Sequence, residues 1–389
     1  MRSVIFNYFM IHILSIGSDR KLFESGSAVA TRSISYGKKL GHLSIIVFSL
    51  KSQKLVPIKL SPEVTVYPTN SSSRLLYICD AIKLGKEVVM KEKFVRGESV
   101  VTCQDPFESG FVGWRIARKF RFPLHLQVHT DFLSPYFKTN ILQRIRVMLG
   151  TFLLPKAEGV RVVSKRIVTS LKSHGVHLKR EPQVLPIRIT LPEEKKSAPA
   201  LHTVPFPEFK FRILMVSRLE KEKRIIDALR ACKDIIASYP HTGLIIAGDG
   251  SEKGLLEKYA SDLGINKSVR FLGWVDNVSS LFTSADVFLS TSEYEGYGMS
   301  VIEAGLAGVP VVTTDVGVAG EVLVDGRNSY IISVGDTMGI AARISELIAH
   351  NERRSALSMA LREDIQTLIP SLEEYEDFYV SGLKQTLHI

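Results

Sequence analysis

The sequence predicts an α/β protein built from two doubly wound, Rossmann-like domains. Its 389 residues exceed what one hydrophobic core usually holds. In both halves short β-branched apolar runs alternate with longer amphipathic segments, which is typical of parallel sheets covered by helices. A proline-rich, charged stretch at residues 191–210 is typical of a linker. We therefore expect a first domain at residues 1–190, a second at residues 211–370 and a terminal helix within residues 371–389.

Each expected strand is a short apolar run, and each expected helix is an amphipathic stretch between two such runs. In the first half the expected strands are Ile11–Ile16, Leu43–Phe48, Val64–Tyr67, Ser99–Cys103, Leu124–Val128 and Gly159–Val163, and the expected helices are Ala28–Leu40, Arg74–Glu92, Gly110–Phe120 and Ile141–Leu154. In the second half the expected strands are Arg212–Val216, Leu244–Ala247, Val269–Leu272, Val287–Ser290, Val309–Thr313 and Tyr330–Ile332. The expected helices there are Arg224–Ser238, Lys253–Leu263, Val278–Ser284, Met299–Gly308, Met338–His350 and a last one near Ser371–Gln385.

The composition, with 45% hydrophobic and 23% charged residues, is that of a globular protein and excludes disordered and fibrous classes. The sequence has three cysteines, which are far apart: Cys79, Cys103 and Cys232. Their odd number and wide spacing predict neither a disulfide framework nor a zinc site. We expect a reducing, cytoplasmic setting. No apolar run approaches the roughly 20 residues that span a bilayer, so we expect at most peripheral association with the inner face of a membrane.

The N-terminal stretch Val4–Ile16 is the nearest candidate for a signal sequence. Asn7 and His12 interrupt it, and no small-residue cleavage site follows, so we do not expect it to be one. Met10 is an alternative start, which would leave residues 1–9 as a loosely held extension.

The net charge of +10 is unevenly distributed along the chain. Residues 1–200 hold 32 Lys and Arg against 14 Asp and Glu, whereas residues 201–389 hold 18 against 26. The first half is therefore at +18 and the second at −8. A strongly basic domain indicates an anionic partner, and the sequence contains no nucleic-acid-binding signature.

The segment Ser290–Asp315 carries the strongest functional pattern. A strand is followed by a turn with Gly296 and Gly298 and then by a helix, which predicts an anion site made of backbone amides and a helix N-terminus. Glu295 and Glu303 flank this turn, and carboxylates accept hydrogen bonds from neighbouring sugar hydroxyls. Taken singly, each glutamate is better explained as a solvated loop charge or a helix N-terminal acid, and only together with the glycine spacing do they favour a binding site.

Several motifs in this half resemble the retaining GT-B glycosyltransferases of family 4. They are the E-x7-E spacing of Glu295 and Glu303 within EGYGMSVIEAGLAGVPVV, the R-L-x-x-x-K element of Arg218 and Lys223, the G-D-G of Gly248 to Gly250, the strand Val269–Val275, and the loop Gly317–Gly326. The resemblance implies two domains facing across a cleft, a terminal helix that crosses back to the first domain, and acceptor binding mainly by the first domain. It also implies a UDP- or GDP-linked sugar as co-substrate, retention of anomeric configuration, and neither a cofactor nor a metal.

The resemblance assigns roles to residues of both halves. Catalytic roles fall to His129, Arg218, Lys223 and Glu295. Donor-binding roles fall to Gly26, Ser27, Gly248, Gly250, Trp274, Val275, Gly296, Tyr297, Gly298, Met299, Ser300 and Glu303. Arg218 and Lys223 follow the first strand of their domain, where open α/β sheets bind ligands, and two cations there can neutralise a diphosphate leaving group. The family commonly has glycine after this lysine, whereas this chain has Arg224, which we interpret as a solvated charge.

The first half offers fewer signals. His129 follows the expected strand Leu124–Val128, where an imidazole can hydrogen-bond a sugar near the reacting carbon, although a lone histidine is more often structural. Asp105 and Glu108 follow another strand and are candidates for acceptor binding, with helix capping an equal explanation for Asp105.

A basic and apolar segment in the first half has two open interpretations. Its charged members are Lys138, Arg144, Arg146, Lys156, Arg161, Lys165, Arg166 and Lys172. Arg144 and Arg146 are candidates for binding an anionic acceptor. The segment could lie on an anionic membrane surface, or its helix could pack on the domain with a solvated basic rim.

Two other functions are open from the sequence. The turn from Gly248 to Gly254 also has the spacing of a dinucleotide-binding loop, which would make the protein an NAD(P)-dependent oxidoreductase. The third glycine is one position late for that motif. A catalytically inactive protein that binds nucleotide sugars is the other alternative, and Arg218, Lys223, Glu295 and Glu303 argue against it.

Overall fold

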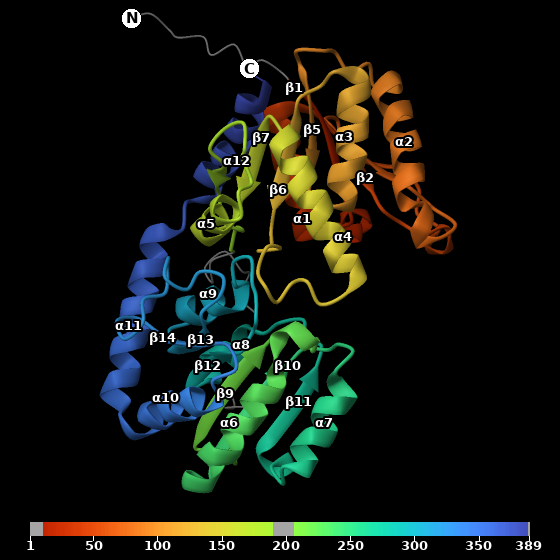
Figure 1. Ribbon diagram of the computed structural model, residues 1–389. Helices are drawn as coiled ribbons and strands as arrows, with labels where there is room; N and C mark the ends of the chain where they lie inside the picture. The colour runs from red at the N-terminus through yellow and green to blue at the C-terminus, as the bar shows by residue number, and fades with distance from the viewer. Residues whose placement is uncertain (1–10, 190–205, 388–389) are drawn as a thin grey trace, which may run out of the picture. The chain divides into compact units, whose positions relative to one another are not determined.

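The computed structural model describes residues 11–189 and 206–387 (Figure 1). Contacts divide the chain into two compact units. The first unit runs to Pro186 and includes the chain from Ser371 onward, and the second is Ile187–Pro370. Residues 1–9 and most of the predicted linker at 191–210 lie outside the described residues.

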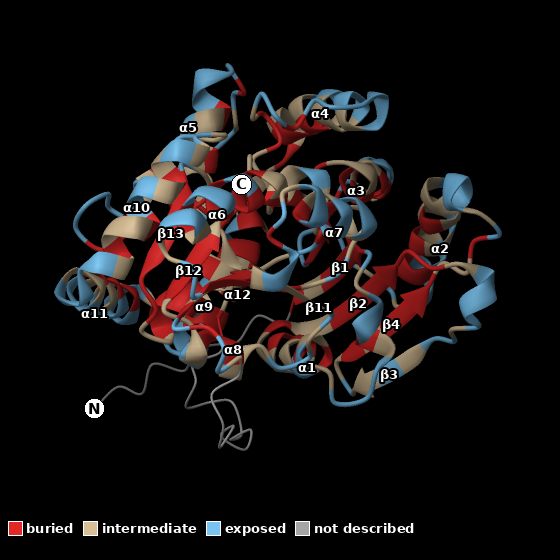
Figure 2. Ribbon diagram, turned by 90° about the horizontal axis from the view of Figure 1, so that it is seen from below, coloured by how far each residue is buried: buried red, intermediate tan, exposed pale blue. Residues whose placement is uncertain are grey.

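The first unit is an eight-stranded sheet with helices on its faces (Figures 1 and 2). Its strands are β1 (Ile11–Gly17), β2 (Gly41–Val47), β3 (Ile58–Ser61), β4 (Val64–Pro68), β5 (Ser99–Cys103), β6 (Leu124–Val128), β7 (Gly159–Val162) and β8 (Gln183–Val184). Its helices are α1 (Ala28–Leu40), α2 (Tyr77–Lys91), α3 (Glu108–Phe120), α4 (Ile141–Leu153), α5 (Lys165–Ser173) and α12 (Leu372–Leu387).

The strand order of the first sheet is β3-β4-β2-β1-β5-β6-β7-β8. Every neighbouring pair is parallel except β3 with β4. The order reverses beside β1, as in Rossmann-type sheets. Buried residues follow the strands in Figure 2, because a sheet covered on both faces has no solvated side.

The helix α12 packs on the first unit although it follows the second unit in sequence. Val380 and Leu383 of α12 belong to the same buried cluster as strands β1, β2 and β4. Its Tyr379 ring stacks on Tyr36 of α1, with ring centroids 4.4 Å apart. The predicted crossing of the last helix to the first domain is confirmed.

The second unit is a six-stranded sheet, parallel throughout, in the order β11-β10-β9-β12-β13-β14. Its strands are β9 (Phe211–Val216), β10 (Thr242–Ala247), β11 (Val269–Gly273), β12 (Val287–Ser290), β13 (Val311–Thr314) and β14 (Tyr330–Ile332). Its helices are α6 (Ile225–Ser238), α7 (Lys253–Asp262), α8 (Ser279–Ser284), α9 (Met299–Leu306), α10 (Thr337–Ala349) and α11 (Asn351–Leu368).

Four elements were absent from the sequence-based expectation. Strand β3 is an antiparallel edge strand between Pro57 and Pro62, and β8 has two residues. Helix α5 buries two of its nine residues, and α11 buries only Leu357, Leu361 and Ile365, a stripe too narrow to signal a helix of 18 residues.

Neither a membrane-spanning helix nor a metal cluster is found in the part of the chain that the structure describes. Within residues 11–189 and 206–387 no helix is long and apolar enough to cross a bilayer. The same ranges contain no group of three His, Cys, Asp or Glu side chains arranged to hold a metal ion. The predicted independence from metal concerns the reaction and stays a prediction.

Candidate functional site

The second unit has a topological switch point between β9 and β12. From β9 the chain first builds the sheet through β10 and β11, and then returns to add β12 on the other side of β9. Loops leaving two such strands diverge and open a crevice at the carboxyl edge of the sheet, where ligands of doubly wound proteins bind. The loops after β9 and β12 carry the predicted residues Lys223 and Glu295.

Lys223 and Glu295 form an ion pair at this switch point. Lys223 ends a short 3-10 turn, and its Nζ lies 2.5 Å from Oε1 of Glu295. The hydroxyl of Ser292 donates to the same carboxylate oxygen at 2.8 Å. Both side chains are partly buried, 14% exposed for Lys223 and 22% for Glu295. The pair is therefore held in place before any ligand arrives, as electrostatic catalysis requires.

Cross-links between loops fix the positions of this pair. The Thr291 hydroxyl donates to the carbonyl oxygen of Lys223 at 2.7 Å. The backbone amide of Glu293 donates to the carbonyl oxygen of Glu222 at 2.9 Å. The Thr314 hydroxyl, at the end of β13, donates to the carbonyl oxygen of Ser292 at 2.6 Å. Loops from three neighbouring strands thus form one hydrogen-bonded assembly.

Arg218 is more loosely held than Lys223. Its side chain is 68% exposed, and Nη2 lies 3.0 Å from Oε1 of Glu222. Exposed ion pairs of this kind contribute at most about 1 kcal/mol. The guanidinium can therefore leave Glu222 for a ligand phosphate at little cost, whereas Lys223 remains in its pair with Glu295.

The turn before α9 has the geometry that the glycine spacing predicts. Gly298 has φ +97° and is the N-cap of α9. The first intrahelical bond is donated by Val301 to the carbonyl of Gly298, so the amides of Met299 and Ser300 precede the hydrogen-bonded ladder. Gly296 and Tyr297 are buried beneath this turn, and Glu303 is half-buried one turn into the helix.

Arg224 is a positioning residue, and the expectation that it is a solvated charge is wrong. Its φ is 46°, a left-handed conformation that favours the glycine common in the family. The guanidinium pairs with Asp227 at 2.7 Å and approaches Glu293 at 3.6 Å. Burial raises the pKa of Glu293, and Arg224 opposes that rise. Arg224 thus ties α6 to the loop that carries Glu295.

Gly248 and Gly250 allow the loops after β9 and β10 to pack directly on each other. A Cβ at Gly248 would lie 1.8 Å from the carbonyl oxygen of Ser217, and one at Gly250 would lie 2.4 Å from that of Leu219. Backbone packing therefore explains these glycines without a ligand, and it disfavours the dinucleotide-loop interpretation.

Replacing Gly248 by alanine is expected to destabilise the second unit by about 3 kcal/mol or more, because the clash adds to strain at φ +143°. Gly254 is the matched control, since it lies in α7 and a Cβ added there would have no atom within 4 Å. Gly254→Ala should be neutral or slightly stabilising. Calorimetric unfolding of both variants tests the difference, and equal stability would contradict the packing role.

The remaining predicted donor residue of this unit that lies at the surface is Trp274. Its side chain is 69% exposed at the end of β11, and Nε1 donates to Oδ1 of Asp276 at 2.9 Å. Val275 beside it is half-buried. An exposed indole at a strand outlet is available to stack on a flat ring, which is what a donor-base role requires.

In the first unit His129 follows β6 and is half-buried. Burial, reinforced by the positive charges of Arg161 and Arg32, lowers the pKa of His129 to about 3. The imidazole is therefore neutral at physiological pH. It is suited to a hydrogen bond with a hydroxyl and not to a cationic role.

The loop before α1 has a structural explanation. The Ser27 hydroxyl accepts from the amide of Ala30 at 3.2 Å and donates to the carbonyl of Lys21 at 2.6 Å, so it caps α1. Gly26 has φ +74° and open space around it. The Ser27 hydroxyl thus already caps α1, and the predicted donor role would have to use the same hydroxyl.

The predicted acceptor residues are largely paired with each other or with backbone. Asp105 accepts from the amide of Phe107 at 2.8 Å and the hydroxyl of Ser109 at 2.7 Å, so the capping alternative explains its position. Glu108 and Arg146 form an ion pair at 2.9 Å. Arg144 is exposed on α4.

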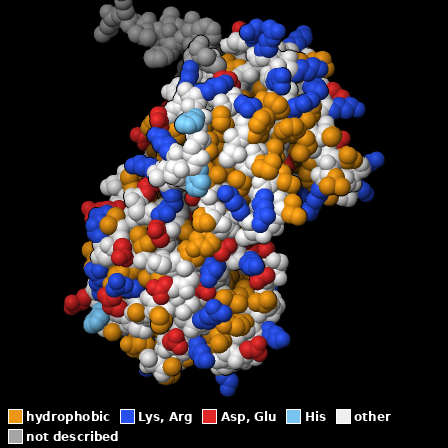
Figure 3. All heavy atoms as spheres, viewed as in Figure 1, with side chains coloured by type: hydrophobic (Ala, Val, Ile, Leu, Met, Phe, Trp, Pro, Cys, Tyr) orange, Lys and Arg blue, Asp and Glu red, His pale blue; other side chains and the backbone are white. Residues whose placement is uncertain are grey.

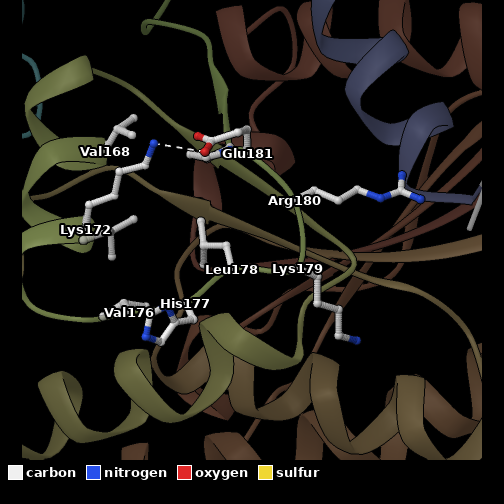
Figure 4. Close-up of a pocket in the computed structure, with 10 residues that line it drawn as sticks. Val168, Lys172, Val176, His177, Leu178, Lys179, Arg180 and Glu181 are labelled. Carbon is white, nitrogen blue, oxygen red and sulfur yellow. Dashed lines mark hydrogen bonds and ion pairs between the residues drawn. The ribbon is translucent and has the colours of Figure 1, made fainter.

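A separate hollow of about 330 Å³ lies beside α5 (Figure 4). Its cations are largely neutralised: Lys172 extends toward Glu181 at 3.0 Å, and Lys179 pairs with Glu158. Arg180 donates to the carbonyl of Gln385 at 2.8 Å. The hollow lies between the end of α5 and the start of β8, away from the carboxyl ends of the strands. We assign it no part in the site.

Residues 202–364 match the family model described as Glycosyl transferases group 1. A curated relative, N-acetyl-alpha-D-glucosaminyl L-malate synthase of Bacillus anthracis, is 31% identical over 175 residues, which are 44% of this chain and 46% of the relative. The aligned region thus spans about half of that protein.

Several solved structures match nearly the whole chain. Sucrose-phosphate synthase from Thermosynechococcus elongatus has a TM-score of 0.81 and 18% identity, covering 97% of this chain and 99% of the other. Anabaena Alr3699/HepE, in complex with UDP and glucose, has a TM-score of 0.74 and 19% identity, covering 96% and 99%. The predicted α/β fold with two parallel-sheet domains is confirmed, and it matches GT-B glycosyltransferases.

Proposed function

We propose that this chain is a retaining, metal-independent glycosyltransferase of family 4. It transfers a hexose from a nucleotide-diphosphate sugar to an anionic or lipid-linked glycan acceptor, in the cytoplasm, during synthesis of envelope polysaccharide or glycolipid. The observation that carries the proposal is the Lys223–Glu295 pair at the switch point of the second unit. The pair lies within the segment that matches the Glycosyl transferases group 1 model.

The second unit supplies groups suited to a nucleotide-sugar donor. Lys223 and Arg218 neutralise the diphosphate, and the free amides of Met299 and Ser300 at the positive end of α9 bind phosphate oxygens. Glu295 accepts hydrogen bonds from sugar hydroxyls, and Glu303 accepts them from the ribose. That HepE was crystallised with UDP and glucose supports this choice of donor.

The transfer step needs no second catalytic carboxylate. The bond between the anomeric carbon and the β-phosphate oxygen breaks, and a bond forms between that carbon and the acceptor hydroxyl oxygen on the same face. The acceptor proton passes to the leaving phosphate oxygen. Lys223 and Arg218 stabilise the negative charge that grows on the diphosphate. We propose His129, which is neutral because its pKa is lowered to about 3, as a hydrogen-bond partner for a sugar hydroxyl.

The acceptor class is proposed from the charge of the first half. That half is at +18, whereas the half that carries the donor motifs is at −8. An anionic acceptor, or one embedded in an anionic membrane, explains why the positive charge is confined to one half.

A thermal-shift panel tests the donor class. UDP, GDP, ADP and their sugar conjugates are added to the full chain, and one base is expected to stabilise it by about 2.7 kcal/mol at a hundredfold excess over its Kd. NAD(P) serves as the comparison ligand. Stabilisation by NAD(P) alone would favour the oxidoreductase alternative, whereas nucleotide binding without sugar transfer or hydrolysis would favour an inactive binding protein.

A further inference from the structure

The helix α4 presents an apolar stripe to solvent. Ile141, Ile145, Met148 and Phe152 are 77%, 46%, 69% and 46% exposed, and Leu142 beside them is 52% exposed. Residues spaced by four, three and four positions lie along one face of a helix. A surface helix normally turns such a stripe toward the core, so its exposure here indicates an interaction surface.

The opposite side of α4 attaches the helix to the first unit. Arg146 on this side pairs with Glu108 of α3. Gly150 packs so closely that a Cβ would lie 2.8 Å from the Phe132 ring, and Leu153 is fully buried. The helix is therefore anchored through an ion pair, a glycine and one leucine, while Ile141, Leu142 and Met148 stay more than half exposed.

Basic and aromatic side chains surround the stripe. Residues 108–158 contain eight Lys and Arg against Glu108, Asp131 and Glu158. Nζ of Lys156 lies 3.8 Å from the centroid of the Phe152 ring, and the Arg118 guanidinium lies 5.7 Å from Trp114. Trp114 and Phe152 are in edge contact at 5.5 Å. In Figure 3 orange and blue side chains are interspersed over this part of the molecule.

We propose that this face of α4 docks the protein on an anionic lipid surface. Apolar side chains flanked by lysine, arginine and aromatic rings fit the boundary between headgroups and acyl chains, where cations meet phosphate and apolar groups leave water. With 13 residues α4 is too short to span a bilayer and would lie in its plane. A second copy of the chain would bring two basic surfaces together, which disfavours self-association.

This docking would place the proposed reaction at a membrane surface. That the acceptor is borne by the membrane rests on the proposed function. Binding in the plane of the headgroups would hold the first unit beside acceptors attached to lipid. Each Lys or Arg near such a surface contributes about 1 kcal/mol, which corresponds to roughly fivefold in affinity. Binding should therefore weaken as salt rises.

Vesicle sedimentation of the full chain tests the docking. Phosphatidylcholine vesicles with and without phosphatidylglycerol are compared, and the wild type is expected to sediment only with the anionic vesicles. Ile141→Ser/Met148→Ser and Lys138→Glu/Lys156→Glu should each weaken binding by about tenfold or more. The matched controls are Leu75→Ser/Met90→Ser and Lys83→Glu, at exposed positions elsewhere on the same unit, which should bind like the wild type.

The readouts separate docking from the proposed function. Vesicle binding requires no donor, and nucleotide stabilisation requires no vesicle, so either can fail alone. The docking proposal is overturned if the wild type ignores anionic vesicles or if the control variants lose binding equally. It is also overturned if the wild type is a dimer that Ile141→Ser/Met148→Ser dissociates without any vesicle binding.

Discussion

Replacing Lys223 by alanine is expected to lower the rate of sugar transfer by roughly 10²- to 10³-fold, the effect of removing one preorganised charge-stabilising group. The lysine lies 2.5 Å from Glu295 at the switch point, so its charge is already in position when the diphosphate begins to leave. The transfer rate and the hydrolysis of the nucleotide sugar measure the effect. Wild-type rates for both would show that the donor site is assigned wrongly.

Lys221→Ala is the matched control, because Lys221 is exposed in the same 3-10 turn. It should keep activity within a factor of about two, as is usual for surface substitutions. The double variant Lys223→Ala/Glu295→Ala adds a further test. If the two residues act as one unit, its activity should resemble that of the worse single variant instead of the product of both losses.

Most of the sheet framework could be predicted from the sequence because its central strands are buried on both faces. Ser99–Cys103 and Leu124–Val128 are buried at every position, and their predicted bounds agree with the structure. Edge elements lack that signal. Strand β3 exposes Lys59 and adjoins two prolines, so its sequence resembles a loop although it pairs with β4.

The residues of the candidate site could be predicted from motif spacing, but their interactions could not. Lys223 and Glu295 are 72 positions apart, and they meet because the sheet places β12 next to β9. The role of Arg224 could not be predicted for a related reason, since its partner Glu293 belongs to the loop after β12. The roles of Glu295 and His129 in catalysis stay predictions until the variants are measured.

Arg161 illustrates a residue whose sequence context is misleading. It was grouped with the surface cations, yet only 5% of it is exposed. It points to the face of the sheet that α12 covers, and its partner Tyr375 lies 214 positions further along the chain. A strand residue between two valines gives no indication that a distant helix will cover it.

Arg161 joins the two points at which the chain leaves and re-enters the first unit. Its guanidinium donates to the carbonyl oxygens of Leu185 and Pro186 at 3.1 and 3.0 Å, where the chain departs. It also donates to the Tyr375 hydroxyl of α12 at 2.8 Å and to Gln127 at 3.0 Å. One buried cation on β7 therefore holds both the segment where the chain leaves the first unit and the helix α12 with which it returns.

Arg161→Met is expected to destabilise the first unit by about 3 kcal/mol, because methionine fills similar space but leaves these buried acceptors without a donor. Trp114 belongs to this unit and Trp274 to the other, so urea unfolding in a Trp274→Phe background follows the first unit alone. Arg180→Met is the matched control, since exposed Arg180 also bonds α12, through Gln385, and its loss should cost about 1 kcal/mol or less. Equal losses in the two variants would mean that burial of Arg161 adds nothing, whereas a loss confined to Arg161→Met would establish it as the anchor of both crossings.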